Sequence, residues 1–311
     1  MGTTWSDIAG WYDELIRAGS GPHETAVGCL VGLLPPSLGG QAVLDVGCGQ
    51  GLATRAVAAA GAERVVGVDS SPEMVDLARG HATPPGVEYV VDDAQTLTSL
   101  EAGSFDGATC QLALMDIPDL DATLGAVCRV LRPGGWFVFV IGHPCFLVPD
   151  ARPTEAADGT PALVVRGYFD ERFWRSANPQ GVRRAGNHHR TLATYLNALV
   201  RAGLSVEEVA EPVATAASGR SVRSTGRCRC SSPPAPGARA DRELPQGLHH
   251  RAARGPGRAV SMRPWSRSRR SSRGSIPHPR VPRRGLGGWT RSVPCRPRTC
   301  CGSPTPPPRR R

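Results

Sequence analysis

Three glycines at alternating positions follow directly after an apolar stretch of the chain. Gly47, Gly49 and Gly51 come after residues 43–46, which also carry an acid, Asp45. Apolar residues then resume at helical spacing, so the pattern predicts a strand, a glycine turn and a helix. Such a turn directs backbone N–H groups and the positive end of a helix at a ligand. Glycine is needed because a Cβ atom would block both the turn and the approach of that ligand.

Acidic residues follow the next two predicted strands. Asp69 ends the strand predicted at 64–69, 24 residues after the acid of the first strand. A carboxylate at this position can accept hydrogen bonds from the two hydroxyls of a ribose. Asp93 and Ala94 follow the strand predicted at 87–91. The chain thus predicts a glycine turn and two acids at the carboxyl ends of three strands.

The elements that position these residues alternate between strand and helix. Helices at 5–16 and 23–34 form a predicted lead-in, and Ser71 and Thr191 are predicted helix caps. Further strands are predicted near residues 104–110, 136–141 and 204–209, and further helices at 120–131 and 192–202. This alternation predicts an α/β fold with a doubly wound, mostly parallel, Rossmann-like sheet.

Two motifs carry a resemblance to a known family. The stretch Leu44-Asp45-Val46-Gly47-Cys48-Gly49-Gln50-Gly51 resembles motif I, xLDxGxGxG, of class I S-adenosylmethionine-dependent methyltransferases. The turn Leu131-Arg132-Pro133-Gly134-Gly135 resembles the L-[RK]-P-G-G turn before their fifth strand. A nicotinamide- or flavin-binding fold is the alternative for the glycine turn alone, but its spacing is G-x-G-x-x-G.

The resemblance implies S-adenosyl-L-methionine as the cofactor and assigns residues to it. Core packing is the alternative role for Tyr12 and Met74. The alternative for Asp116 and Asp119 is that they are solvated acids on the loop and helix after the fourth strand. The residues assigned to the cofactor are Tyr12, Asp45, Gly47, Cys48, Gly49, Gly51, Asp69, Ser70, Met74, Asp93, Ala94, Gln111, Leu112 and Met115.

Methyl transfer from a sulfonium is an in-line displacement, so the enzyme mainly aligns the acceptor and excludes water. An oxygen nucleophile also needs a base. His143, after the fifth strand, is the first candidate, and His188 with His189 is the second; a structural histidine is the alternative for each. Residues 142–190, here called the lid segment, carry aromatic and arginine side chains suited to a planar or anionic small-molecule acceptor with an O-, N- or C-nucleophile.

Charge divides the chain into two parts. Residues 1–214, the predicted methyltransferase domain, hold 25 acidic residues and 14 arginines, whereas residues 215–311 hold 2 acids and 23 arginines. An acidic domain repels phosphates, so nucleic acid is not the expected partner. The chain has neither an apolar leader nor an apolar run long enough to span a membrane, so a cytoplasmic location is expected.

The tail at 215–311 lacks hydrophobic periodicity, so disorder is predicted there together with the loss of a normal seventh strand. An arm that binds nucleic acid and translation out of frame are the two main explanations for its composition. A metal module is not expected, because the tail cysteines lack zinc-knuckle spacing: Cys228, Cys230, Cys295, Cys300 and Cys301. The alternative functions are therefore a methyltransferase that binds RNA through this tail and a non-catalytic pseudoenzyme with a damaged C-terminus.

Overall fold

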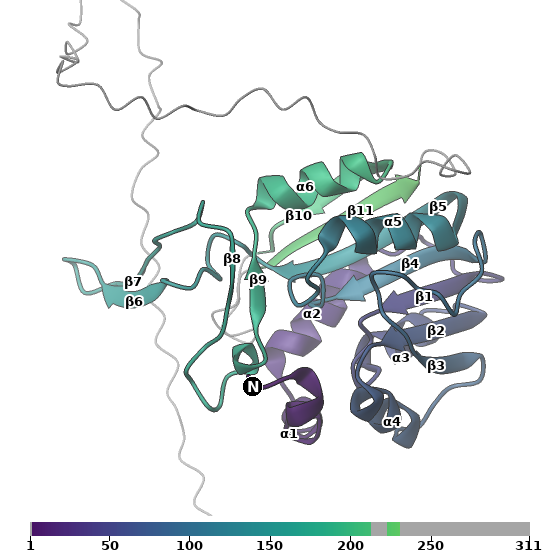
Figure 1. Cartoon of the computed structure of the whole chain (residues 1–311), viewed down its shortest axis with the longest axis horizontal. Coiled ribbons are helices and arrows are strands. Elements are labelled where there is room, and N and C mark those ends of the chain that lie inside the picture. Colours follow the sequence, from purple (N-terminus) through teal and green to yellow (C-terminus); the bar gives the residue numbers. More distant parts are fainter. Residues whose placement is uncertain (1, 213–222, 231–311) are drawn as a thin grey trace, which may run out of the picture. The chain divides into compact units, whose positions relative to one another are not determined.

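The computed structural model describes residues 2–212 and 223–230, which lie in the first of two compact units, residues 1–244 and 245–311. A seven-stranded sheet in the order β10-β11-β5-β4-β1-β2-β3 forms its centre (Figure 1). Its strands are β1 (Ala42–Val46), β2 (Arg64–Asp69), β3 (Val87–Val91), β4 (Phe105–Gln111), β5 (Leu131–Gly142), β10 (Leu204–Ala210) and β11 (Arg223–Cys230). The helices are α1 (Trp5–Arg17), α2 (Gly21–Gly32), α3 (Leu52–Ala59), α4 (Pro72–Gly80), α5 (Leu120–Val130) and α6 (Leu192–Arg201).

The predicted doubly wound, mostly parallel sheet is confirmed. Strands β1 to β5 pair in parallel, and the chain order reverses between β1 and β4. Open α/β sheets bind ligands at such a reversal, outside the carboxyl ends of the strands. The topology therefore places a crevice next to the ends of β1 and β4.

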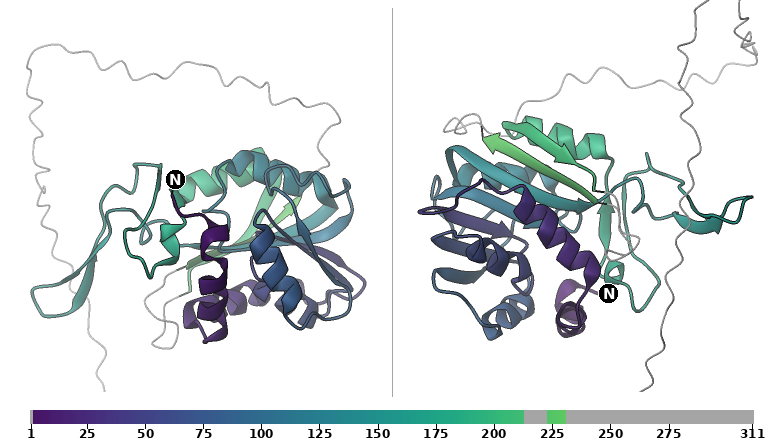
Figure 2. Two further views of the ribbon diagram at one scale, coloured as in Figure 1. Left: turned by 60° about the horizontal axis from the view of Figure 1, so that its bottom comes forward. Right: turned by 180° about the vertical axis from the view of Figure 1, so that it is seen from behind.

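Helices cover both faces of the sheet (Figures 1 and 2). One buried cluster lies under α5 and α6, and a second lies under α2 and α3. Alternate side chains of β5 enter opposite clusters because strand side chains have a period of two. Those facing α5 and α6 are Phe137, Phe139 and Ile141, and those facing α2 and α3 are Trp136, Val138 and Val140.

Two predicted helix caps are confirmed. The Ser71 hydroxyl accepts a hydrogen bond from the backbone N–H of Met74 at the start of α4, with Pro72 in the first turn. The Thr191 hydroxyl accepts from the backbone N–H of Thr194 at the start of α6. Each cap satisfies a donor that the helix itself leaves unpaired.

The predicted loss of the seventh strand is wrong. Strand β11 lies antiparallel between β5 and β10, with Cys228 opposite Phe137. Gly226 leaves room for the ring of Phe139, since a Cβ atom there would lie 2.7 Å from that ring. The predicted disorder is equally wrong for residues 223–230; the rest of the predicted tail lies outside the described residues.

Charge pairing explains why hydrophobic periodicity missed β11. The Arg229 Nε atom lies 2.6 Å from Glu207 Oε1, and the Arg227 Nε atom lies 3.1 Å from Glu207 Oε2. A second carboxylate, Glu208, lies 3.4 Å from Arg227. Opposite charges on neighbouring strands stabilise their pairing, so arginines counted as disorder-promoting here support a strand.

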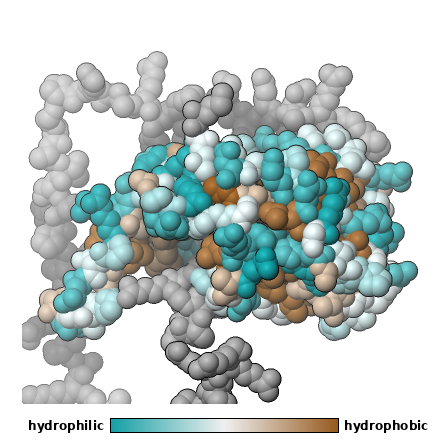
Figure 3. Space-filling model, turned by 90° about the horizontal axis from the view of Figure 1, so that it is seen from below, coloured by the Kyte–Doolittle hydropathy of each residue, from teal (hydrophilic) through white to brown (hydrophobic). Residues whose placement is uncertain are grey.

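The lid segment forms two small antiparallel sheets. Strands β6 (Arg152–Glu155) and β7 (Pro161–Val164) make an exposed ribbon that projects from the body (Figure 1). Strands β8 (Arg172–Trp174) and β9 (Asn187–His189) pair next to the main sheet, with the short 3-10 helix η1 (Val182–Arg184) between them. Hydrophilic residues cover much of the face in Figure 3, and hydrophobic ones appear in separate areas. No helix among the described residues is long and apolar enough to cross a membrane.

Candidate functional site

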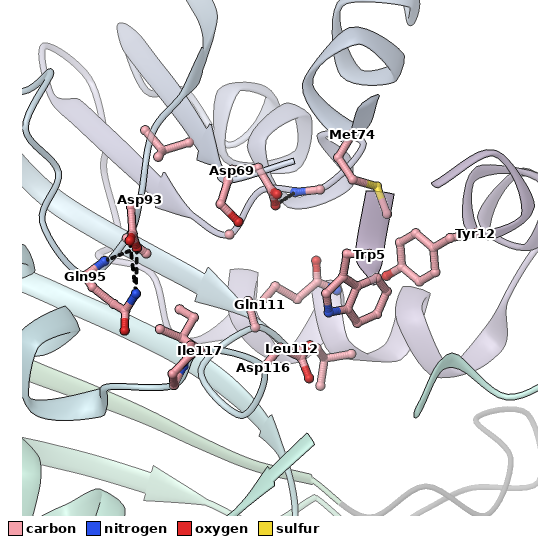
Figure 4. A pocket seen from close by; sticks show the side chains of 17 residues that line it. Trp5, Tyr12, Asp69, Met74, Asp93, Gln95, Gln111, Leu112, Asp116 and Ile117 are labelled. Carbon is pink, nitrogen blue, oxygen red and sulfur yellow. Dashed lines mark hydrogen bonds between the residues drawn. The ribbon is translucent and has the colours of Figure 1, made fainter. Parts of the chain in front are cut away.

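A cavity of about 330 Å³, here called the main cavity, opens at the edge where β1, β2 and β4 end. Most residues assigned to the cofactor line it: Tyr12, Gly47, Gly49, Asp69, Ser70, Met74, Asp93, Ala94, Gln111 and Leu112. In Figure 4, Trp5, Tyr12 and Met74 lie at one end of the cavity, and Asp93 with Gln95 lies at the other. Sequence reasoning did not assign Trp5, Gln95, Ala113, Asp116, Ile117 and Pro118 to this site.

The glycine turn needs glycine for three different local reasons. All three glycines have positive φ angles: 66° at Gly47, 53° at Gly49 and 86° at Gly51. A Cβ atom at Gly49 would meet nothing within 4 Å, so this backbone borders open space. One at Gly47 would lie 2.5 Å from the Cβ of Ala113, and one at Gly51 would lie 2.4 Å from the hydroxyl of Tyr89. Gly51 therefore leaves room for the Tyr89 side chain of β3, whereas Gly49 presents backbone to the cavity.

Asp45 does not line the main cavity but lies beneath the glycine turn. Its side chain is buried and accepts hydrogen bonds from the hydroxyls of Thr54, at 2.6 Å, and Thr109, at 2.9 Å. Burial raises the pKa of Asp45 to about 6. Because Thr54 belongs to α3 and Thr109 to β4, this carboxyl joins three elements of the site.

Three other assigned residues also lie outside the main cavity. Gly51 packs against Tyr89, as described above. Cys48 is buried against Tyr89 and Val75, and it lines a small neighbouring hollow together with Gly47 and Gly49. Met115 is buried in the core beneath α5 and α6. All three residues lie in loops rather than strands, so the alternation of side chains along a strand could not place them.

Asp69 links the glycine turn to the start of α4. Its Oδ2 atom accepts from the Gly49 N–H at 2.8 Å, and its Oδ1 atom accepts from the Ser71 N–H at 2.9 Å. Burial raises the pKa of Asp69, and these backbone donors oppose that effect. Each carboxylate oxygen has a further lone pair, so Asp69 can still accept hydrogen bonds from a ligand.

The far end of the main cavity is built by a small polar network. Asp93 accepts from the backbone N–H of Gln95 at 2.9 Å and from its side-chain amide at 3.0 and 3.1 Å. The side-chain Oε1 atom of Gln95 in turn accepts from the Asp119 N–H at 3.0 Å. Asp119 is exposed, as expected of a solvated acid, and it also caps α5 by accepting from the Ala122 N–H. The network fixes the loop after β3 against the loop before α5.

A second hollow of about 440 Å³, here called the side hollow, shares Trp5, Ser70, Asp116 and Pro118 with the main cavity. His188 lines it from β9, and its ring centroid lies 4.7 Å from that of Phe173 on β8. Burial and the positive charge of Arg190 lower the pKa of His188. The predicted candidate base His188 therefore lies beside the cavity where the lid segment meets the sheet.

Asp116 is not the solvated acid that the sequence suggested. Only 11% of its side-chain surface is exposed, and its Oδ1 atom lies 2.5 Å from Nη1 of Arg183. Burial raises the pKa of Asp116 to about 6, and Arg183 opposes that rise. Asp116 lines both hollows, which places a buried carboxylate at their junction.

Arg190 holds the loop that carries Asp116. Its guanidinium donates to the backbone carbonyls of Leu114 at 3.0 Å, Ile117 at 2.7 Å and Pro118 at 2.6 Å. The backbone N–H of His188 also donates to the Met115 carbonyl at 2.7 Å. The lid segment therefore fixes this loop, a role that sequence reasoning did not foresee because the partners are more than 70 residues apart.

His143 lines neither the main cavity nor the side hollow. Its Nδ1 atom accepts from the Cys145 N–H at 3.2 Å, so the ring proton resides on Nε2, which donates to Glu211 at 2.8 Å. The bond joins the end of β5 to the residue after β10. His189 is buried, and its Nε2 atom lies 2.8 Å from the Tyr168 carbonyl oxygen. Within residues 2–212 and 223–230, no group of His, Cys, Asp and Glu side chains could hold a metal ion.

Residues 44–139 match the protein family described as a methyltransferase domain. A ubiquinone biosynthesis O-methyltransferase from Xanthomonas axonopodis is 43% identical over 98 residues, which cover 31% of this chain and 41% of that protein. One from Bordetella avium is 39% identical over 108 residues, covering 34% and 44%. The match thus spans about two fifths of these relatives.

A solved structure from Mesorhizobium loti, of an S-adenosylmethionine-dependent methyltransferase, is 31% identical to this chain. The match covers 65% of this chain and 96% of that one, with a TM-score of 0.56.

Proposed function

This chain belongs to the class I S-adenosylmethionine-dependent methyltransferases, and we propose that it transfers a methyl group from S-adenosylmethionine to a small-molecule acceptor. The observation that carries the proposal is the convergence of the open backbone at Gly49 and the carboxylate of Asp69 in one cavity. Both lie at the carboxyl ends of parallel strands next to the reversal of strand order, where such folds bind ligands.

The residues of the main cavity fit a nucleoside with an amino-acid chain. Gly49 presents backbone without a Cβ obstruction, and Asp69 has acceptor capacity left for ribose hydroxyls. Met74 offers an apolar surface, and Asp93 with the backbone of Ala94 offers an acceptor and a donor for a base. Bound there, S-adenosylmethionine would supply an electrophilic methyl group on its sulfonium sulfur, and S-adenosylhomocysteine would be the leaving group.

The other residues align the acceptor and exclude water. The side hollow meets the main cavity at Asp116, so an acceptor held there has its nucleophile beside that carboxylate. Asp116 is the group we assign as proton acceptor for a hydroxyl nucleophile, with His188 as the second candidate in the same hollow. His143, which bonds to Glu211 away from both hollows, is assigned to joining the segment after β5 to the segment after β10.

Calorimetric titration of S-adenosylhomocysteine into the full chain tests the proposal. We expect binding that D69N weakens by tenfold or more, because the variant loses one charged acceptor facing the ribose (about 1.4 kcal/mol per tenfold). The matched control is D76N, whose carboxylate lies exposed on α4 beside Arg79 and outside the main cavity. A folded protein that does not bind, or equal loss in both variants, contradicts the proposal.

A further inference from the structure

The side hollow has a chemical character of its own, separate from the main cavity. Aromatic rings bound it from two directions: Trp5 from α1, and Phe173 and His188 from the β8–β9 pair. Phe173 and His188 lie in register on neighbouring strands, with their rings inclined at 50°. Flat aromatic surfaces that line a hollow favour a planar ring as the ligand.

Arg175 gives this hollow a positive charge that pairs with no carboxylate in the described part of the chain. Its guanidinium lies 4.7 Å from the centroid of the Phe173 ring, and the side chain lines the hollow. Two other arginines of the lid segment have carboxylate partners: Arg172 pairs with Asp150, and Arg183 with Asp116. Among residues 2–212 and 223–230, no carboxylate lies within ion-pair distance of Arg175.

The acidic side chain that lines the hollow, Asp116, already has a positively charged partner. Asp116 is paired with Arg183, and Arg190 adds a further positive charge to the loop that carries it. His188 faces the same space, where burial and Arg190 disfavour its charged form. The hollow therefore carries a net positive charge, which comes from Arg175 and lies next to aromatic rings. Where the hollow meets the main cavity, the Asp116 carboxylate can accept a hydrogen bond from a hydroxyl.

We propose that the side hollow is the acceptor subsite and that it takes a hydroxylated aromatic carboxylate, with the ring against Phe173 and His188 and the carboxylate on Arg175. The phenolic hydroxyl then lies toward Asp116, at the junction with the main cavity. This proposal rests on the proposed function, because it assigns the acceptor of that same reaction. An Arg–carboxylate pair beside aromatic rings is charge-assisted and directional, so it selects the acid over a neutral analogue of the same shape.

The test compares 4-hydroxybenzoate with 4-hydroxybenzamide, a neutral analogue of nearly the same shape. Each is titrated into the full chain, both alone and saturated with S-adenosylhomocysteine. We expect the acid to bind about tenfold more tightly than the amide, as one charge-assisted interaction predicts. R175M abolishes this preference while S-adenosylhomocysteine affinity stays unchanged, and R175K keeps part of it because lysine retains the charge without the planar fork.

The control variant is R152M, which removes an arginine from the exposed β6 strand outside both hollows. It should keep the full preference for the acid. Three results would overturn the acceptor assignment: the unaltered chain binds the acid and the amide equally, it binds neither, or the preference for the acid survives in R175M. If the unaltered chain does not bind S-adenosylhomocysteine, the proposed function itself is overturned. The two failures can therefore be told apart.

Discussion

Replacing Asp45 by asparagine tests whether a buried carboxyl beneath the glycine turn controls the stability of the site. Asp45 has 1% of its surface exposed, and burial raises its pKa from 3.8 to about 6. Asparagine has nearly the same shape and never ionises. Its carbonyl oxygen can accept one threonine hydroxyl, and its amide can donate to the oxygen of the other, so the contacts with Thr54 and Thr109 are retained.

The pH dependence follows from where each state holds the proton. Between pH 3.8 and about 6 the folded protein keeps a proton on Asp45 that the unfolded chain has released. The stability of the unaltered chain therefore falls as the pH rises through this window and levels off above it. The difference between these two pKa values corresponds to about 3 kcal/mol of folding free energy. The stability of D45N, measured relative to the unaltered chain, should therefore rise by about this much from the acid to the neutral end of the range.

Urea unfolding followed by tryptophan fluorescence from pH 4 to 8 measures this difference. The control is D121N, which removes an exposed carboxylate bonded to Arg201 and should leave the pH profile close to that of the unaltered chain. If the difference in free energy of unfolding between D45N and the unaltered chain is the same at every pH, Asp45 does not hold its proton to about pH 6 and the reasoning fails.

Two further predictions concern the turn and the proposed proton acceptor. G51A should lower the free energy of unfolding in urea by about 1–2 kcal/mol or more, because φ is 86° and the new Cβ would lie 2.4 Å from the Tyr89 hydroxyl; an unchanged midpoint contradicts this. D116N should slow methyl transfer by about 10²–10⁴-fold while S-adenosylhomocysteine still binds. The unaltered enzyme's rate should rise with pH through about 6, where Asp116 ionises, and D116N should lack this rise.

Features that depend on neighbouring residues could be predicted from the sequence. Ser71 and Thr191 cap helices because their hydroxyls need only a backbone N–H three residues on. Gly47 lies directly after β1 and Asp69 is the last residue of β2. A parallel sheet brings these strand ends to one edge, so their meeting in one cavity also follows from the pattern. The convergence of separate motifs on one cavity therefore needed only the βα rhythm.

Features that depend on distant charge pairing could not be predicted. Asp116 appeared solvated because its partner Arg183 lies 67 residues later in the chain. Strand β11 appeared disordered because hydrophobic periodicity does not detect the pairing of Arg227 and Arg229 with Glu207 and Glu208 on the neighbouring strand. In both cases the charged residues are evident in the sequence. The local pattern does not show which oppositely charged residue lies next to each of them in the fold.

The lid segment contributes to the site through two parts with different physical roles. Residues 183–190 are fixed to the sheet edge: Arg183 pairs with Asp116, Arg190 binds three carbonyls of one loop, and the His188 N–H donates to Met115. The β6–β7 ribbon, by contrast, is exposed along its length and borders neither hollow. Since β8 is paired to the fixed β9, Phe173 is held in place, and Arg175 follows directly after this paired strand. A preformed subsite loses less entropy when it orders a ligand. Acceptor selectivity should therefore depend on the β8–β9 pair, whereas the ribbon can change in length or sequence without altering it.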